Sequence, residues 1–592
     1  MHRACKLALD DLGTFLSKRF SARRLTSVRA KQLGLSFTKG DYGWIIKTSI
    51  LFEGQSLSIV VLPTVNFPYE VPKIYVKPDL PVLSYPHVEH NGKLCVWDNE
   101  VGYDALDIRY TEQLILDAHS LLEKVTTHQL DSDFDRGFLS YWMFAHPVTA
   151  KVNSLCRVGL QETKQVYVAY TRKKGTVFAD SLAELKSWLN NVGIKPRSHM
   201  ISKSFMLHIE SPWLPSEYPK KLSQIIEIIR SQASENEDVY TLISEMLCAP
   251  TKYPMFLIQI PSESGNTVVG MCTETNAFIT GNRKTEFRHP LLGNGFRANR
   301  VFPKQLFRRA EYLNLHGINV ERNDVEWVLG RGVNEPLRDI STHKIGVVGL
   351  GSVGSGVLPI LVRAGFSKFV LIDGDSLEAA NIGRHWLGDP HVGMNKAKAC
   401  EIELKRMFPW VQVIHAGEQD WFSNERSICE LKQCDLIISS TGEWASDIYF
   451  GELLKQEELE CPVLFAFTEP HAVATHCYLN HSGRFNFGRL FSNTGQLLTP
   501  VVKFSASTQK RLPTCGGYFQ PYGGMELSFG HSMIAELVTD VVTGSVNIEH
   551  DIHRIWVSSL SLVESNGGKW NEDWMSINGT PEKGAYIVTL KT

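Results

Sequence analysis

The chain has 592 residues, with 61 Lys and Arg against 63 Asp and Glu, which gives a formal net charge of −2 at pH 7. A charge so close to zero gives no support to a general nucleic-acid or anionic-membrane surface, and we expect neither partner. No apolar run approaches the roughly 20 residues that span a bilayer, so we expect a cytoplasmic protein. From the length we expect about three to five domains.

The N-terminal stretch 7–20 contains Asp10, Asp11 and Lys18. These charges predict an amphipathic helix rather than a secretory signal peptide. The chain has eleven cysteines at irregular spacing and no C-x-x-C pair. An odd number without a secretory segment favours free thiols in a reducing compartment, and the missing pairs argue against a structural zinc site.

Two proline-containing segments lie before a predicted helix. They read NFPYEVPKIYV over 66–76 and PHVEHNGKLCVW over 86–97. Prolines mark the ends of strands, and the Asn91-Gly92 turn would place Cys95 on an exposed ledge. Apolar residues at helical spacing predict a helix over 111–125.

These segments resemble ubiquitin-conjugating enzymes, in which a Y-P-x-x-P-P segment precedes H-P-N and then N-G-x-I-C. The resemblance implies a ubiquitin-conjugating-like α+β domain over 1–160, in which Cys95 carries a thioester. Val88 and Glu89 stand where the family has proline and the asparagine that steadies the oxyanion during attack by lysine.

A replacement for that asparagine could be His90 or Asn91, and we take Asn91 as the candidate catalytic residue. His87 aligns with the histidine of the family pattern. We expect His87 to have a structural role rather than an acid–base one.

The middle region, 161–335, alternates strand-like and helix-like stretches, which predicts a folded α/β domain rather than a flexible tether. No catalytic constellation is recognisable in it. The predicted strands are 166–170, 205–209 and 256–260, the predicted helices are 181–192 and 221–230, and 231–238 reads as a loop.

A glycine turn follows the apolar stretch 344–348 and precedes a helical stretch, 357–364. Such a turn presents backbone N–H groups and a helix N-terminus to a phosphate chain. Its glycines are Gly349, Gly351 and Gly354.

Acidic and polar residues then follow the second strand, 369–372. The order of these residues suits a triphosphate better than a nicotinamide ring, although a dinucleotide-dependent dehydrogenase shares the glycine turn and the first acid. The residues are Asp373, Asp375, Asn381, Arg384 and Lys396.

This ordered set resembles the adenylation core of ubiquitin-activating enzymes and bacterial ThiF-type adenylyltransferases. The resemblance implies a Rossmann-like domain over 336–592 that uses ATP and Mg²⁺. By the same resemblance, Asp373 and Asp375 would hold the ribose and the metal, and Arg384 and Lys396 would neutralise the phosphates.

The chain departs from the ThiF pattern after the strand-like run 435–441. Gly442 stands where the family has a metal-binding aspartate, and Glu443 follows it, with Asp447 beyond. Mg²⁺ needs only one or two carboxylates plus phosphate oxygens. Asp375 and Glu443 are therefore the predicted metal ligands, with the D-x-D pair alone as the alternative.

Cys515 lies between glycine-rich stretches, before an apolar helical run at 529–538. Glycines on both sides favour a mobile loop. In activating enzymes the thioester cysteine lies on such a segment, so the resemblance implies that Cys515 accepts the activated acyl group.

A chain that joins these three parts resembles the bacterial fusion enzymes of type II CBASS antiphage systems. The resemblance implies ATP-dependent adenylation of a protein C-terminus, a thioester relay through Cys515 and Cys95, and transfer to a lysine of an unidentified target. It further implies that the activated protein is a nucleotidyltransferase related to cyclic GMP-AMP synthase, primed for antiviral defence, and that the enzyme is a homodimer.

Two other interpretations stay open. A sulfur-carrier adenylyltransferase for cofactor biosynthesis would use the C-terminal half and leave Cys95 without a role. A non-catalytic scaffold would account for the departures at Glu89 and Gly442.

Overall fold

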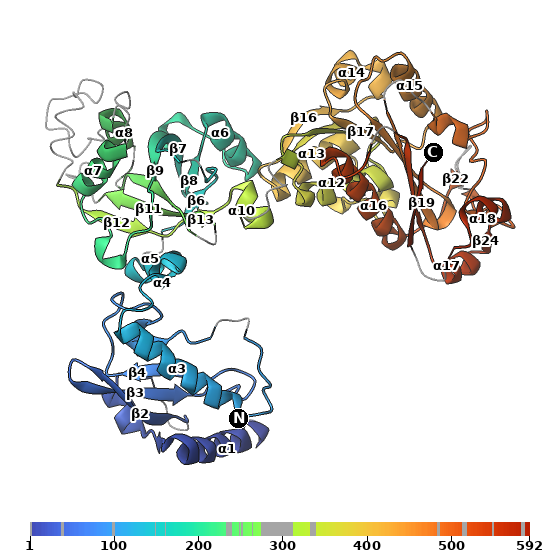
Figure 1. Ribbon diagram of the computed structural model, residues 1–592. Coiled ribbons are helices and arrows are strands. Elements are labelled where there is room, and N and C mark those ends of the chain that lie inside the picture. Colours follow the sequence, from blue (N-terminus) through green and yellow to red (C-terminus); the bar gives the residue numbers. More distant parts are fainter. Residues whose placement is uncertain are drawn as a thin grey trace. The chain divides into compact units, whose positions relative to one another are not determined.

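The computed structural model divides into two compact units, 1–182 with 197–322 and 183–196 with 323–592. Figure 1 labels helices and strands of both units. The residues that the structure describes are 3–36, 41–97, 101–147, 150–159, 161–232, 239–247, 249, 251, 253–262, 265–273, 312–331, 339–481, 486–511, 518–547, 550–581 and 586–591.

The first unit begins with a five-stranded antiparallel sheet in the order β1-β2-β3-β4-β5. Its apolar face packs with helices α1 (Arg3–Phe20) and α3 (Tyr110–Thr126) in one core. Helix α3 buries one face, at positions spaced three or four apart, as an amphipathic helix does. The strands are Arg23–Arg24, Trp44–Phe52, Gln55–Leu62, Lys73–Lys77 and Lys93–Leu94, and a short helix, α2, spans Ser27–Gln32.

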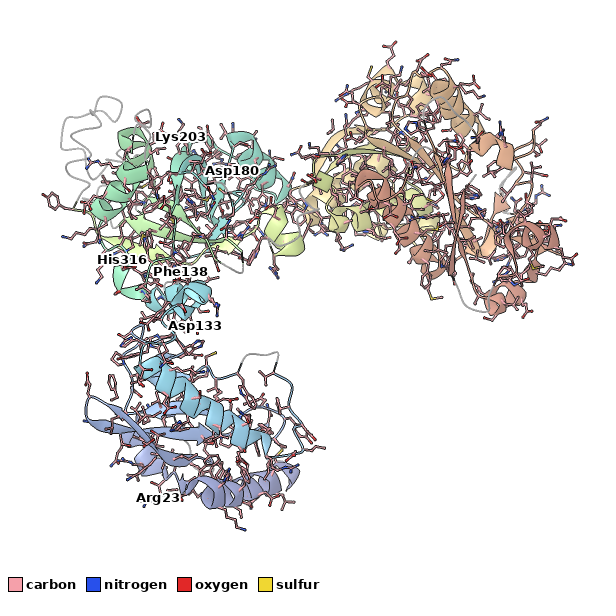
Figure 2. All side chains as sticks on the ribbon, viewed as in Figure 1. Arg23, Asp133, Phe138, Asp180, Lys203 and His316 are labelled. Carbon is pink, nitrogen blue, oxygen red and sulfur yellow. The ribbon has the colours of Figure 1, made fainter. Side chains whose placement is uncertain are left out.

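Two short helices follow, α4 (Asp133–Arg136) and α5 (Phe138–Ala145). Gly137 separates them, and a Cβ at that position would lie 2.7 Å from the ring of Tyr141. The chain needs glycine there because the tyrosine ring occupies the space. Figure 2 labels Asp133 on α4 and Phe138 on α5.

Helix α5 also belongs to the core of the second sheet of this unit. Phe138 and Trp142 are buried with apolar residues of that sheet, and the indole N–H of Trp142 donates to the carbonyl of Ile318 at 3.2 Å. One short helix thus contacts both parts of the first unit.

The second sheet has eight strands in the order β12-β11-β10-β9-β7-β8-β6-β13. Helices α7 (Leu222–Gln232) and α8 (Val239–Leu247) bury their apolar faces in its main core. The strands are β6 Val152–Ser154, β7 Lys164–Thr171, β8 Gly175–Ala179, β9 Ile201–His208, β10 Met255–Ile260, β11 Thr267–Thr273, β12 Leu315–Ile318 and β13 Glu321–Arg322.

The second unit contains an eight-stranded sheet in the order β16-β15-β14-β17-β18-β19-β23-β25. The first five of these strands are parallel and the last three are antiparallel. The strands are β14 Lys344–Val348, β15 Lys368–Ile372, β16 Gln412–Gly417, β17 Leu436–Ser439, β18 Val463–Thr468, β19 Ala474–Asn480, β23 Ile552–Val557 and β25 Tyr586–Lys591.

Strand β14 lies between β15 and β17, so the chain order reverses on either side of it. Ligands of open α/β sheets bind at such a switch point, beyond the carboxyl ends of the strands. Helix α12 (Ser352–Ala364) leaves that point and packs against α16 (Gly524–Val542). The other helices named below are α13 Lys396–Met407, α14 Glu425–Leu431 and α15 Trp444–Lys455.

The predicted fold class is confirmed: an N-terminal α+β part, a middle α/β part and a C-terminal part with a parallel, Rossmann-like sheet. The helices predicted over 7–20, 111–125, 181–192 and 221–230 correspond to α1, α3, α6 (Leu182–Asn191) and α7. The predicted loop 231–238 lies mostly outside the described residues. The domain boundaries at 160 and 335 stay a prediction.

Among the described residues, no helix is both long enough and apolar enough to cross a bilayer.

Candidate functional site

The glycine turn connects β14 to α12. Gly349 has a φ of 84°, and a Cβ there would lie 2.6 Å from the backbone nitrogen of Thr441. A Cβ on Gly354 would lie 2.0 Å from the carbonyl oxygen of Gly349. These two glycines are required by the fold of the turn. A Cβ on Gly351, the N-cap of α12, would meet no described atom within 4 Å, so that side of the turn is open to a ligand.

Asp373, at the end of β15, holds the turn in place. One of its carboxylate oxygens accepts from the backbone N–H of Leu350 at 2.6 Å, and the other accepts from the N–H of Asp375 at 2.8 Å. Burial raises the pKa of Asp373, and Lys396 opposes that rise. A nearby cation therefore helps to keep the buried carboxylate of Asp373 ionised.

That cation is Lys396, at the start of α13. Its ammonium group lies 2.8 Å from the carboxylate of Asp375 and 4.0 Å from that of Asp373. Asn395 caps α13 and also donates its side-chain N–H to the carbonyl of Asp373 at 2.7 Å. The end of β15 and the start of α13 are thus tied together.

These groups converge on one pocket at the switch point of the sheet. The sequence-predicted residues that line it are Gly349, Gly351, Asp373, Asp375, Lys396 and Glu443. A segment that the sequence analysis missed also lines it, at Gln419, Asp420, Trp421 and Phe422. This segment follows β16, and the rule that ligands bind at the carboxyl ends of parallel strands could have found it.

Asn381 and Arg384 are not among the residues that line this pocket. The side-chain oxygen of Asn381 accepts from the backbone N–H of Glu378 at 3.0 Å, in a short helical turn. The guanidinium of Arg384 lies 5.4 Å from the ring centroid of Tyr522 and donates to the carbonyl of Ala380 at 3.3 Å. Their predicted contacts with the triphosphate stay a prediction.

His385 is a residue of this site that sequence reasoning missed. It is buried, its Nε2 donates to the carbonyl of Leu350 at 2.8 Å, and its Nδ1 accepts from the N–H of Leu387 at 2.9 Å. Burial lowers the pKa of His385 to about 4, so the ring is neutral at pH 7. A neutral imidazole thus supports the glycine turn without adding charge.

The carboxylates of the pocket fit a hard divalent cation. Asp375 is 77% exposed and Glu443 lines the same pocket, so both can reach a metal that is also bound by phosphate oxygens. Asp447 accepts from Ser439 Oγ at 2.8 Å, and burial raises its pKa to about 7. Among the described residues, no group of three or more His, Cys, Asp or Glu is placed to hold a metal by itself.

The first unit holds the other predicted thiol, Cys95, directly after β5. Its side chain is exposed, and its backbone N–H donates to the carbonyl of His87 at 3.0 Å. Val88 pairs with Leu94 in an antiparallel bridge, so the segment between them forms a tight hairpin. The predicted exposed position of Cys95 is confirmed.

Asn91 is at the tip of that hairpin, in the left-handed region at a φ of 62°. Its carbonyl accepts from the ammonium of the buried Lys77 at 2.9 Å. A Cβ on Gly92 would lie 2.5 Å from the carbonyl oxygen of Val76, which explains the glycine. Asn91 thus has a backbone role in the turn, and its side chain is exposed.

Glu89 is paired within the same hairpin. Its two carboxylate oxygens accept from the ammonium of Lys93 at 2.9 and 2.8 Å. Lys93 is a partner that the sequence-based expectations did not include, and it offsets the negative charge at the position of the family asparagine.

Cys515, the predicted acceptor of the activated acyl group, lies outside the described residues. The helical run that follows it is confirmed as part of α16. His531 of α16 donates from Nε2 to the carbonyl of Ser352 at 2.9 Å.

Two protein families match this chain, one in its C-terminal part and one in its N-terminal part. Residues 329–467 match the ThiF family, and residues 18–150 match prokaryotic E2 family B. The predicted fusion of a ubiquitin-conjugating-like part with a ThiF part is confirmed at the level of these families.

Curated relatives point the same way over limited stretches. An ATP-dependent ubiquitin transferase-like protein Cap2 of Pseudomonas aeruginosa is 34% identical over 142 residues, which is 22% of this chain and 24% of that protein. Cap2 of Enterobacter hormaechei subsp. hoffmannii is 30% identical over 168 residues, 26% of each chain. Ubiquitin-like modifier-activating enzyme 5 of Xenopus laevis is 37% identical over 81 residues, 14% of this chain and 20% of the enzyme. The matches thus span about a quarter of the length of the two Cap2 proteins.

Solved structures similar to this chain include MccB of E. coli, crystallised with ATP. The alignment covers 43% of this chain and 65% of MccB, at 13% identity and a TM-score of 0.29.

Proposed function

We propose that this chain, in which a prokaryotic E2 family B segment is joined to a ThiF family segment, activates the C-terminus of a protein with ATP and transfers it to an amine. The observation that carries the proposal is the convergence of the open glycine turn, the acids of β15 and Lys396 on one pocket. The other unit carries an exposed thiol in the hairpin expected of a conjugating enzyme.

The first step is adenylation. A carboxylate oxygen of the substrate attacks the α-phosphorus of ATP, the bond to the bridging oxygen breaks, and pyrophosphate leaves. Negative charge accumulates on the phosphates, so cations must stand where it develops. We assign that role to Lys396 and Arg384, and we assign the ribose to Asp373. Gly349 and Gly351 line the pocket, and the N–H groups at Gly351 and the start of α12 would face the phosphates.

Mg²⁺ bound between the phosphates and a protein carboxylate would neutralise part of this charge. Asp375 and Glu443 are the residues that would hold it, since both line the pocket. Glu443 then replaces the aspartate for which this chain has Gly442.

The second part of the reaction passes through two thiols. A thiolate at Cys515 attacks the acyl carbon of the adenylate and AMP leaves, and Cys95 then takes over the acyl group by thioester exchange. This exchange is nearly balanced in free energy, whereas the final attack by a lysine amine forms a stable amide. Placing both thiols in one chain raises their effective concentration.

We further propose that the activated protein is a nucleotidyltransferase related to cyclic GMP-AMP synthase and that conjugation primes it for antiviral defence. The relatives named Cap2 support this context. A homodimeric enzyme in the cytoplasm belongs to the same proposal.

The test is a trapping experiment with the full chain. Cys95→Ser replaces the thioester by a stable oxygen ester, so the acyl group stops at position 95. The variant would be co-expressed with the genes that neighbour its own, and the ester-linked peptide identified by mass spectrometry. We expect the C-terminal residues of a neighbouring nucleotidyltransferase.

A trapped peptide from another protein would exclude the defence substrate but keep the activity. A free thiocarboxylate on a small carrier protein, with nothing on position 95, would favour the sulfur-carrier alternative. Absence of any ester or adenylate would overturn the proposal.

A further inference from the structure

The thiol of Cys95 has a histidine beside it, and that histidine has its own carboxylate. Both the Cys95 thiol and Asp133 lie close enough to the His87 ring to raise its pKa. The bond from His87 Nε2 to Asp133 Oδ2 is 2.9 Å long. Because a carboxylate can only accept, Nε2 carries the proton, and Nδ1 is left as the base of the neutral ring.

The backbone of the hairpin brings this pair together. The N–H of Cys95 donates to the carbonyl of His87, so the two residues lie opposite each other. His87 has a φ of 62°, in the left-handed region that a side chain rarely adopts. Its own N–H donates to the hydroxyl oxygen of Tyr141 at 3.0 Å, which fixes that conformation. Such strain persists only where the surroundings determine it, and it concentrates at functional sites.

The pKa of His87 is set by its neighbours, and two of them are Cys95 and Asp133. The neighbouring Cys95 raises the pKa of His87, burial lowers it, and Asp133 raises it again, with a net rise. The groups acting on His87 are Cys95 from its own hairpin and Asp133 from α4, with Tyr141 from α5 on its backbone. The guanidinium of Arg136 lies 3.6 Å from Asp133 Oδ1, whereas His87 bonds to the other carboxylate oxygen, Oδ2.

We propose that Cys95, His87 and Asp133 form a proton relay in which His87 is a catalytic base and Asp133 and Tyr141 are positioning residues. The proposal departs from the expectation that His87 has a structural role, and it rests on the proposed role of Cys95 as acyl carrier. A thiol paired with an oriented imidazole gives the nucleophile–base–orienter arrangement known from unrelated hydrolases and transferases.

The step that the relay serves is loading of Cys95. The proton of the thiol passes to His87 Nδ1 as the sulfur forms a bond to the acyl carbon of the incoming thioester. The bond from that carbon to the donor sulfur breaks, and the proton on His87 neutralises the departing thiolate. Asp133 stabilises the imidazolium between the two proton transfers. No oxidant or further reactant is needed.

The test measures the thiol itself and so does not depend on any conjugation activity. The full chain is alkylated with iodoacetamide at pH 6 to 10, and the rate for the Cys95 peptide is read by mass spectrometry. His87→Gln and Asp133→Asn should each slow alkylation at pH 7 by about threefold to tenfold, because a thiol without a base is mostly protonated there. The difference should vanish above about pH 9.5, where any thiol is ionised.

Asp135→Asn is the matched control. Asp135 is an exposed residue of the same short helix, two positions away, and its loss changes the charge by the same amount. It should alkylate at the wild-type rate at every pH. Tyr141→Phe keeps the ring over Gly137 and removes only the acceptor for the His87 N–H, so a smaller slowing is expected at pH 7.

Equal rates at pH 7 for wild type and Asp133→Asn would overturn the relay. A slowing that persists unchanged at pH 10 would overturn it as well, because that pattern reports lost access rather than a lost base. If His87→Gln does not fold, Asp133→Asn still decides. The relay would stand if alkylation responds as expected while no acyl group is ever trapped on Cys95, and in that case the proposed function fails alone.

Discussion

The ammonium group of Lys396 lies 2.8 Å from the carboxylate of Asp375, although the lysine side chain is 11% exposed and the aspartate side chain is 77% exposed. The pair joins the first residue of α13 to the loop after β15 at the edge of the pocket. The nearly buried ammonium thus has the exposed Asp375 on one side and the buried Asp373 on the other, and a phosphate can take the place of Asp375.

Lys396→Ala should abolish ATP–pyrophosphate exchange, because it removes the cation that faces the developing charge. Lys398→Ala is the control on the same helix, since Lys398 pairs with Glu401 at 2.7 Å and lies outside the pocket. Exchange would be measured with radiolabelled pyrophosphate and the protein substrate. We expect Arg384→Ala to fail as well, and exchange at the wild-type rate in either the Lys396 or the Arg384 variant would refute the assigned ATP site.

Two glycines of the turn should respond differently to an added methyl group. Gly351→Ala should fold normally but bind ATP at least about tenfold more weakly, because its Cβ would stand on the open side of the turn. Gly354→Ala should lower stability by about 1–3 kcal/mol, because its Cβ meets the carbonyl of Gly349. Thermal unfolding and ATP titration by calorimetry would separate the effects. Normal ATP binding by a folded Gly351→Ala protein would place the nucleotide elsewhere.

The order of the two thiols can be read from their acyl states. Cys515→Ala should still form the adenylate but carry no thioester on either thiol. Cys95→Ala should keep a thioester at Cys515 and lose the conjugate. Mass spectrometry of non-reduced samples would measure both, and a thioester on Cys95 in the Cys515→Ala protein would refute the proposed order.

Asn91 is predicted to steady the oxyanion as lysine attacks the thioester. Asn91→Gly removes the amide and tolerates the φ of 62° without strain, so it should load normally and transfer to lysine about 10²–10³-fold more slowly. Asn91→Asp keeps the turn propensity but replaces the donor by a carboxylate, and it should be equally slow. Single-turnover discharge of preloaded protein onto free lysine is the measurement. Wild-type discharge rates in both variants would leave Asn91 with its backbone role alone.

Asp447 should make the second unit less stable as the pH rises. Its pKa is raised to about 7 by burial, whereas that of an unfolded aspartate is near 4. Between these values the unfolded state gives up its proton first, so stability is greatest below about pH 4 and declines towards pH 7. Asp447→Asn should remove the decline and gain up to about 4 kcal/mol relative to wild type at pH 8, and almost nothing at pH 4.

Hydrogen–deuterium exchange of the β17 and α15 peptides at pH 5 and pH 8 would measure this locally. Glu452→Gln, on the surface of the same helix, is the control and should leave the pH dependence unchanged. A wild-type protection that does not fall between the two pH values would refute the raised pKa.

The sequence predicted those parts of the site that are contiguous in the chain. The apolar run before Gly349 and the acids after Ile372 lie at the ends of adjacent parallel strands, so local pattern places them correctly. Cys95 was predicted as exposed because the Asn-Gly turn and the prolines are local signals too.

The parts that escaped prediction depend on contacts between distant segments. Asp133 reaches His87 across 46 positions, and no spacing rule links an acid in a four-residue helix to a histidine in a hairpin. His385 was missed because its role is to bind a backbone carbonyl, which no pattern in the sequence records. The pair of Glu89 and Lys93 is the exception, because two opposite charges four positions apart are a local signal in the sequence.

Tyr141 and Trp142 are neighbours in the chain, yet the first fixes the histidine of the hairpin and the second is buried in the core of the eight-stranded sheet. A fragment cut after α3 would keep the five-stranded sheet and Cys95, and would lose the carboxylate and the hydroxyl that hold His87. A fragment that begins after α5 would expose the apolar surface that Phe138 and Trp142 cover. Helix α5 is therefore a poor place to divide the protein, and a piece meant to test the thiol chemistry in isolation must carry the middle sheet with it.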